Sequence, residues 1–223
     1  MDHYSLNEIE ASARKAARGA GMTWGLAEEA GKATRWLAAR GLPNVSTLLT
    51  LLSENDGKDY DSLCPQNLSQ NWSASGGVLC PVIAGSTLND LAHNIVLGQE
   101  IKLEAVNCPA LILPILGRAS KALGHGFRIS WEGVVINILP DTLYLETGTI
   151  EDLGTTFTSE VVVDGLSSDS GNVSGLNIER VVKGVPLNNQ DWCHLQTFAA
   201  RTYVPASEES RLLGAGAGLT DND

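Results

Sequence analysis

The chain has 223 residues, of which 43% are hydrophobic and 18% are charged. This length suits one fair-sized domain or two small ones, and this composition excludes a disordered chain and a coiled coil. The net charge of −11 opposes bulk binding to nucleic acid or to an anionic membrane. The charge is unevenly spread, because residues 1–40 carry six basic and five acidic groups. The acidic excess therefore belongs to residues 41–223.

The cysteines form no CxxC pair, so we predict neither a zinc finger nor a thioredoxin motif, and no metal or cofactor. Charged residues are spread through the first 30 positions, so this segment lacks the continuous apolar core of a signal peptide. The longest apolar run, 108–116, is far shorter than the ~20 residues that span a bilayer. We predict a soluble, cytoplasmic protein of bacterial type with free thiols, and no membrane or nucleic-acid partner.

Residues 1–56 predict a helical subdomain of about three helices. Ser5 and Glu8 have the spacing of a capping box, and apolar residues recur behind them with helical spacing. A second helix is expected to end at Gly41, because a glycine can cap it and Pro43 prevents its continuation. Residues 57–76 are turn-rich, so they are expected to form a boundary or a surface loop.

Residues 77–223 predict an α+β body, and the chain as a whole predicts an N-terminal helical layer with a mixed, largely antiparallel sheet and C-terminal helices. A single domain of residues 1–223, with 57–76 as a surface loop, is the alternative. Pro114 is expected either to kink a helix or to move its start. The predicted strands are 78–83, 100–106, 127–131, 133–139, 142–146, 160–163 and 178–182. The predicted helices are 86–98, 110–123, 188–200 and 206–213.

The C-terminal segment is the densest in polar groups. Arg201, Tyr203, Ser207 and Arg211 are predicted to bind a ligand, because guanidinium groups clamp carboxylates or phosphates. Three glycines at 214–218 follow a predicted helix, whereas the dinucleotide fingerprint places its glycines between a strand and a helix. The competing interpretation is a flexible tail after the helix.

Asp191 and His194 are candidates for catalytic groups. They are three residues apart on a predicted helix, a spacing at which the carboxylate can fix the imidazole tautomer. His125 lies between two glycines, and a turn that exposes its imidazole makes it a further ligand-binding candidate. The competing interpretation is structural in each case: a capped helix start, and a histidine that suits a helix C-terminus.

Two stretches carry a family resemblance. Ser5-Leu-Asn-Glu-Ile-Glu, Trp24-Gly-Leu-Ala-Glu-Glu-Ala and Trp36-Leu-Ala-Ala-Arg-Gly-Leu-Pro43 resemble the start of the bacterial family catalogued as domain of unknown function 3726. The segment from Arg201 to Asp223 is similar to the end of that family. The family has no known activity, so the resemblance implies no function and transfers no catalytic residue.

Three hypotheses of function follow from the sequence. The first is a small-molecule-binding or accessory protein that holds a small anion near residues 201–218, and a homodimer is compatible with it. The second is a metabolic enzyme acting on a small carboxylated metabolite, with Asp191 and His194 as acid and base and Arg201 as the anion clamp. The third is a structural subunit of a complex, based on the apolar face of the N-terminal helices.

Overall fold

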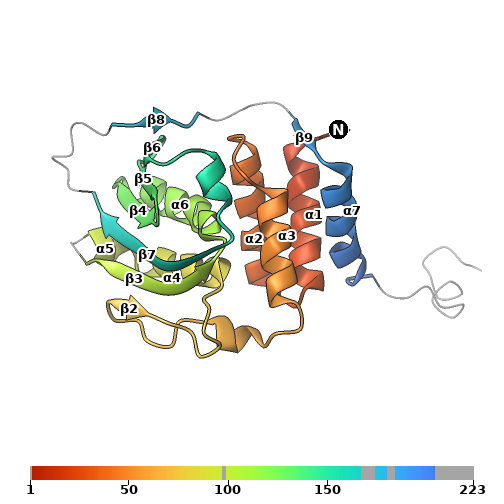
Figure 1. The fold of residues 1–223 in the computed structure, drawn as a ribbon, viewed down its shortest axis with the longest axis horizontal. Coiled ribbons are helices and arrows are strands. Elements are labelled where there is room, and N and C mark those ends of the chain that lie inside the picture. The colour runs from red at the N-terminus through yellow and green to blue at the C-terminus, as the bar shows by residue number, and fades with distance from the viewer. Residues whose placement is uncertain (1, 97–98, 167–173, 180–183, 204–223) are drawn as a thin grey trace, which may run out of the picture.

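The computed structural model describes residues 2–96, 99–166, 174–179 and 184–203 (Figure 1). Helices gather on one side of the molecule and a mixed sheet with its own helices on the other (Figure 1). The predicted α+β class, with its N-terminal helices and its largely antiparallel sheet, is therefore confirmed. Among the described helices, none combines the length and the apolarity that crossing a bilayer requires.

Four helices form the helical side: α1 (Leu6–Gly19), α2 (Trp24–Ala38), α3 (Val45–Asn55) and α7 (Asn189–Ala200). The predicted capping box is confirmed, since the Glu8 amide donates to Ser5 Oγ at 3.2 Å and the Ser5 amide donates to Glu8 Oε2 at 2.8 Å. Small residues let these helices approach closely, because a Cβ added at Gly31 of α2 would lie 2.9 Å from the carbonyl oxygen of Glu10 in α1.

The N-terminal residues pair with the strand that precedes α7, beside this helical side. Strand β1 (Asp2–Tyr4) pairs antiparallel with β9 (Val185–Leu187), and the ring of Tyr4 stacks on Trp192 with centroids 3.9 Å apart. Helix α7 packs on α1 and α3 (Figure 1). The C-terminal helix thus completes a layer that the N-terminal residues begin.

The larger sheet has seven strands within the described residues, in the order β2-β3-β7-β4-β5-β6-β8. Only β2 and β3 pair in parallel, and the other neighbours are antiparallel. Large apolar side chains alternate along the strands and are buried on one face, as a half-covered sheet requires. The strands are β2 (Asn71–Trp72), β3 (Ile101–Asn107), β4 (Phe127–Trp131), β5 (Val134–Ile138), β6 (Leu143–Thr147), β7 (Phe157–Gly165) and β8 (Leu176–Asn177).

Helices α4 (Pro81–Asp90), α5 (Ala92–Val96) and α6 (Leu113–Leu123) pack on the sheet. The strand predicted at 78–83 is wrong: α4 begins at Pro81, and Leu79 makes only an isolated bridge to Val106. A continuous apolar run has the same pattern in a buried helix as in a buried strand, and proline in the first turn suits a helix. Residues 86–98 hold the end of α4 and then α5, with a break at Leu91, where one helix was predicted.

Other predicted elements of residues 77–223 differ from the structure in where they begin or end. Pro114 moves the start of α6 and does not kink it, since a short 3₁₀ helix (Pro109–Ile112) precedes α6 and Pro114 lies in its first turn. The strand predicted at 178–182 is wrong at 178–179, because β8 ends at Asn177, and its other residues lie outside the described part of the chain. The helix predicted at 206–213 lies wholly outside the described residues. The strand predicted at 160–163 is part of β7, which is longer at both ends.

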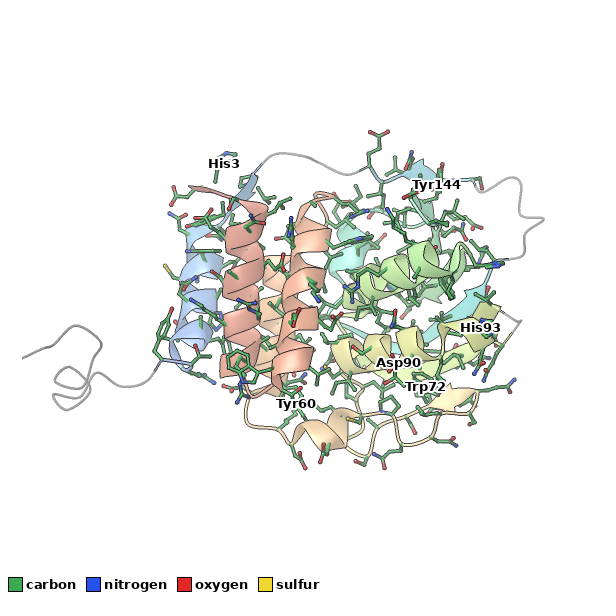
Figure 2. The ribbon with its side chains drawn as sticks, turned by 180° about the vertical axis from the view of Figure 1, so that it is seen from behind. His3, Tyr60, Trp72, Asp90, His93 and Tyr144 are labelled. Carbon is green, nitrogen blue, oxygen red and sulfur yellow. The ribbon has the colours of Figure 1, made fainter. Side chains whose placement is uncertain are left out.

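One hydrophobic cluster runs from the helical side into the sheet side. Helix α2 contacts α4 and α6, so the end of α2 lies beside α6 at the junction of the two sides (Figures 1 and 2). Figure 2 also shows Tyr60 below α1, where its hydroxyl donates to the carbonyl of Ala20 at 3.3 Å. A division of the chain at residues 57–76 stays a prediction.

Candidate functional site

A pocket of about 570 Å³ lies where the helical side meets the sheet side. The last turns of α2 form one wall, α6 forms the second, and the turn between β5 and β6 (139–142) forms the third. A volume in this range is typical of sites for small molecules, which prefer such junctions between packed layers. The pocket is therefore the first candidate for a functional site among the described residues.

Basic side chains converge on this pocket. Five of the chain's 15 Lys and Arg residues line it, although the chain as a whole is acidic. Glu10 and Asp141 are the acidic residues among its lining. The basic residues come from the end of α2 and from α6: Lys32, Arg35, Arg40, Arg118 and Lys121.

Ion pairs fix the cations of this pocket in position. Arg35 Nη1 lies 2.7 Å from Glu10 Oε2, which joins α2 to α1. Arg118 on α6 pairs with Glu29 on α2, and these half-buried groups join the two walls. Because the partners come from neighbouring helices, the ion pairs hold the guanidinium groups at the pocket.

Lys32 lies among these groups with two carboxylates beside it. Its Nζ is 2.8 Å from Glu28 Oε1 and 3.4 Å from Glu29 Oε1. The hydrogen bond to Glu28 raises the pKa of Lys32 above its ordinary value, and burial opposes that shift only in part. The ammonium therefore stays charged at neutral pH. At the outer rim, Lys121 Nζ lies 3.2 Å from Asp141 Oδ1, and both of these side chains are largely exposed.

An aromatic ring and an apolar wall complete the pocket. The Arg40 guanidinium lies over the Trp36 ring, with its Cζ 3.6 Å from the ring centroid. The indole fits beside α6 because position 117 is glycine, where an added Cβ would lie 3.2 Å from Trp36 Cζ2. The facing wall is the β5–β6 turn, where Leu139 and Pro140 are half-buried.

This arrangement can bind an anion and cover its apolar part. Its positive groups are the guanidiniums and ammoniums that recognise carboxylates and phosphates in proteins. Among the described residues, no group of three or more His, Cys, Asp or Glu side chains is placed to hold a metal ion.

Two buried thiols are poorly suited to nucleophilic chemistry. Burial raises the pKa of Cys80 to about 11 and that of Cys108 to about 12. Both side chains are therefore protonated at neutral pH, and the thiolate is the reactive form.

The structure places the predicted C-terminal candidates at the far end of the helical side. Arg201, directly after α7, donates to both carboxylate oxygens of Asp56 at 2.6 and 3.0 Å. Tyr203 is 59% exposed, and Lys15 Nζ lies 5.5 Å from its ring centroid. Ser207 and Arg211 lie outside the described residues. A ligand site at this segment stays a prediction.

The histidine candidates fall in two different places. His194 is exposed on α7 and stacks on Phe198 with centroids 5.4 Å apart, and Arg201 lies over the same ring at 4.5 Å. The structure thus brings His194 and Arg201 to one aromatic side chain, while Asp191 lies in the first turn of α7. His125 is exposed in the turn between α6 and β4, where its carbonyl accepts a hydrogen bond from Ser120. Figure 1 shows α6 and α7 on opposite sides of α1 and α2.

The sequence reasoning missed the basic pocket. One signal for it was present, because residues 1–40 are nearly neutral in an acidic chain and carry Lys32, Arg35 and Arg40 near the end of one predicted helix. No pattern in the sequence around α6 indicated that Arg118 would line the same pocket. Arg118 meets Glu29 across 89 positions of sequence, and only the folded chain brings them together.

The family resemblance seen in the sequence is confirmed over part of the chain. Residues 4–80 match the model of a family described as protein of unknown function (DUF3726). This region holds all of α1 and α2, and with them Lys32, Arg35 and Arg40 of the pocket. The resemblance of the C-terminal segment stays a prediction. No curated protein matches the chain at the level of sequence.

The fold resembles that of a solved dehydrogenase. The crystal structure of a dehydrogenase from Sinorhizobium meliloti aligns with a TM-score of 0.58 at 11% identity, over 89% of this chain and 99% of the other. A malate dehydrogenase from Entamoeba histolytica aligns with a TM-score of 0.39 at 9% identity, over 66% of this chain and 46% of the other. At these identities the first similarity concerns the fold alone.

Proposed function

We propose that the protein binds a small anionic metabolite in the pocket between α2, α6 and the β5–β6 turn. The observation that carries the proposal is the convergence of five basic side chains on one concave site of an acidic protein. Like charges repel, so five cations on one concave surface need carboxylate partners or an anionic ligand to offset that repulsion.

The charge of the pocket favours an anion of low charge. The five lining cations face four nearby carboxylates, those of Glu10, Glu28, Glu29 and Asp141. The excess of about one positive charge matches a monoanion, whereas a polyphosphate would meet repulsion from the carboxylates. The half-buried wall of Leu139 and Pro140 suits the apolar body of such a ligand.

The test is a calorimetric titration of the full chain with single small anions: benzoate, acetate and inorganic phosphate. We expect measurable binding of at least one of them. Arg118→Gln should weaken that binding about tenfold or more, because a charged hydrogen bond to the ligand is worth roughly 1.5–3 kcal/mol. Arg201→Gln is the matched control, since its guanidinium also pairs with a carboxylate but lies outside the pocket.

Two results of that titration would overturn the proposal. The first is the absence of binding for every anion tried at millimolar concentration. The second is an equal loss of affinity in Arg118→Gln and Arg201→Gln, because the loss would then come from a general effect on the protein and not from a contact in the pocket. Circular dichroism of both variants separates this second result from simple unfolding.

A second candidate function is an oxidoreductase that acts on the bound carboxylate. The fold similarity to a dehydrogenase over nearly the whole of that chain favours it. In such a reaction a hydride would pass between a carbon of the metabolite and a nicotinamide ring. The test mixes the protein with an oxidised nicotinamide dinucleotide and a panel of hydroxylated carboxylic acids, and follows the absorbance of the reduced ring. Turnover that Arg118→Gln lowers and Arg201→Gln preserves supports this candidate, and no turnover on any acid leaves the binding function alone.

A further inference from the structure

Two exposed aromatic side chains stand at the end of the helical side where α2 begins and α7 ends. Trp24 is 65% exposed and Tyr203 is 59% exposed, more than any other tryptophan, tyrosine or phenylalanine of the described residues. Arg18 Cζ lies 5.3 Å from the ring centroid of Trp24. Lys15 Nζ lies 5.5 Å from that of Tyr203. We call these four side chains the aromatic-basic patch.

Helix α1 supplies the centre of this patch. Lys15 and Arg18 are three positions apart in α1, so they are neighbours on one face of that helix. Helix α1 packs between α2 and α7 (Figure 1), and the two rings come from the start of α2 and from just after α7. The patch therefore crosses three helices, with the cations in the middle and a ring on each side.

The two cations of the patch have no carboxylate partner. Arg35, Arg118 and other basic side chains pair with carboxylates, whereas Lys15 and Arg18 make no ion pair with any residue that the structure describes. Arg18 Nη1 donates to the carbonyl of Met22 at 2.9 Å, which holds the guanidinium beside Trp24. The chain has 26 acidic and 15 basic residues, so the two cations are not left unpaired for lack of carboxylates in the chain.

The patch has the composition of a protein interface and lies apart from the anion pocket. Tryptophan, tyrosine and arginine are the residue types that contribute most often to binding energy between proteins. The space beside Trp24 is open, because a Cβ added at Gly25 would have no atom within 4 Å. Trp24 is about 18 Å along α2 from Trp36 of the pocket, at a rise of ~1.5 Å per residue.

We propose that the aromatic-basic patch is a docking surface for an acidic segment of another protein. Charge complementarity selects this occupant, because two unpaired cations attract carboxylates and the flanking rings cover apolar side chains of the same segment. Lys15 and Arg18 are about 4.5 Å apart along the axis of α1, which matches carboxylates one turn apart on a helical segment.

The other occupants fit the patch less well. A nucleic acid is a polyanion, and the net charge of −11 opposes its approach beyond these two cations. A second copy of this chain, in a symmetric contact, would bring the same two cations against themselves. The inference is independent of the anion pocket, so either can fail without the other.

The test titrates the full chain into a fluorescein-labelled synthetic peptide and follows the fluorescence anisotropy. The peptide has about fifteen residues of glutamate, leucine and alanine, a length at which a helix can form in water. A matched peptide carries glutamine in place of every glutamate. We expect the acidic peptide to bind with a Kd below about 1 mM, and the glutamine peptide to bind at least about tenfold more weakly.

Variants of the patch then locate the binding. Lys15→Gln combined with Arg18→Gln should weaken the binding of the acidic peptide about tenfold, since an exposed charge pair contributes up to about fivefold. Trp24→Ser should weaken it about threefold or more through the lost ring. The matched controls on the sheet side are Lys102→Gln and Phe157→Ser, which also remove an exposed cation and an exposed ring and should change nothing. Circular dichroism confirms that each variant is folded.

Several results would overturn the inference. One is no binding of the acidic peptide, or equal binding of the two peptides. Another is an affinity that the patch variants leave unchanged or that the controls lower equally. Tighter binding of a single-stranded oligouridylate would assign the patch to nucleic acid, and a dimer in sedimentation that Trp24→Ser abolishes would assign it to a second copy. Binding that appears only after Glu208→Gln and Glu209→Gln would assign it to the C-terminal residues of this chain.

Discussion

Two regions of this protein place arginines against carboxylates, and they differ in what surrounds the pairs. In the pocket, Arg35 and Arg118 pair with Glu10 and Glu29, and further cations and an apolar wall face the same hollow. After α7, Arg201 is held by both oxygens of Asp56 on the surface. The exposed fractions of the arginines are close, at 39% for Arg118 and 44% for Arg201. Convergence on a concave surface, and not burial, distinguishes the candidate site.

The difference also separates an arginine that is already satisfied from one that remains available to a ligand. A bidentate pair occupies the two N–H donors of a guanidinium with which it would otherwise bind the carboxylate of a ligand. Arg201 makes such a pair within the chain, and its pairing lowers the pKa of Asp56. The pairs of the pocket are made through a single guanidinium nitrogen each, as for Arg35 Nη1 with Glu10.

The largest expected effect comes from reversing one charge in each region. Arg35→Glu should lower the affinity for the anion by at least about a hundredfold, because a carboxylate close to the bound anion costs several kcal/mol. Arg201→Glu should leave the affinity within about twofold, since the change is remote from the pocket and screened by salt. Titration calorimetry of both variants measures the two affinities. A similar loss of affinity in both variants would contradict the assignment of anion binding to the pocket.

A smaller effect is expected when the internal carboxylate of the pocket is neutralised. Glu29→Gln should raise the affinity for the anion by up to about fivefold, because Arg118 and Lys32 lose a competing partner and a part-exposed pair is worth up to about 1 kcal/mol. Asp56→Asn should leave the affinity unchanged. A weaker affinity in Glu29→Gln would mean that Glu29 serves mainly to position Arg118. Titrations of the two variants under one set of conditions decide this point.

The smallest effect concerns the surface pair and the pH dependence of stability. The hydrogen bond from Arg201 lowers the folded-state pKa of Asp56 below its ordinary value of 3.8. Because the pKa is lower in the folded state, the ionised carboxylate stabilises the folded protein at pH values above the ordinary pKa. This contribution is lost as the pH falls through the folded-state pKa. Asp56→Asn should therefore lower the melting temperature slightly at pH 7 and leave it equal to that of the wild type in strong acid. Thermal unfolding at several pH values measures the difference, and a gap that widens in acid would contradict the assignment.

The sequence predicted the fold class well, but it predicted a strand at 78–83, where the structure begins helix α4. Caps and periodicity are local, so the capping box of Ser5 and Glu8 could be predicted and is confirmed. The segment 78–83 could not be predicted correctly from its own residues. Its apolar run fits a buried strand and a buried helix equally. In the folded chain it forms helix α4, which packs on the sheet.

The chemistry of a small anion held by arginine was predicted from the sequence for the C-terminal segment, and the function proposed for the pocket uses the same chemistry. The prediction for the C-terminal segment followed residue density along the chain, whereas the pocket was found from density in space. Arg201 illustrates the difference, because its partner Asp56 lies 145 positions earlier and could not be inferred from neighbouring residues.

The sequence by itself determined the α+β class, the starts of the N-terminal helices and the near-neutral charge of residues 1–40, because these depend on hydrogen bonds, spacing and composition within short segments. Only the tertiary structure decided that Glu29 meets Arg118, that Gly117 makes room for Trp36, and that α7 completes the N-terminal layer. Each of these contacts joins segments far apart in the chain. Their energy comes from burial and charge pairing that exist only after the hydrophobic cluster has formed.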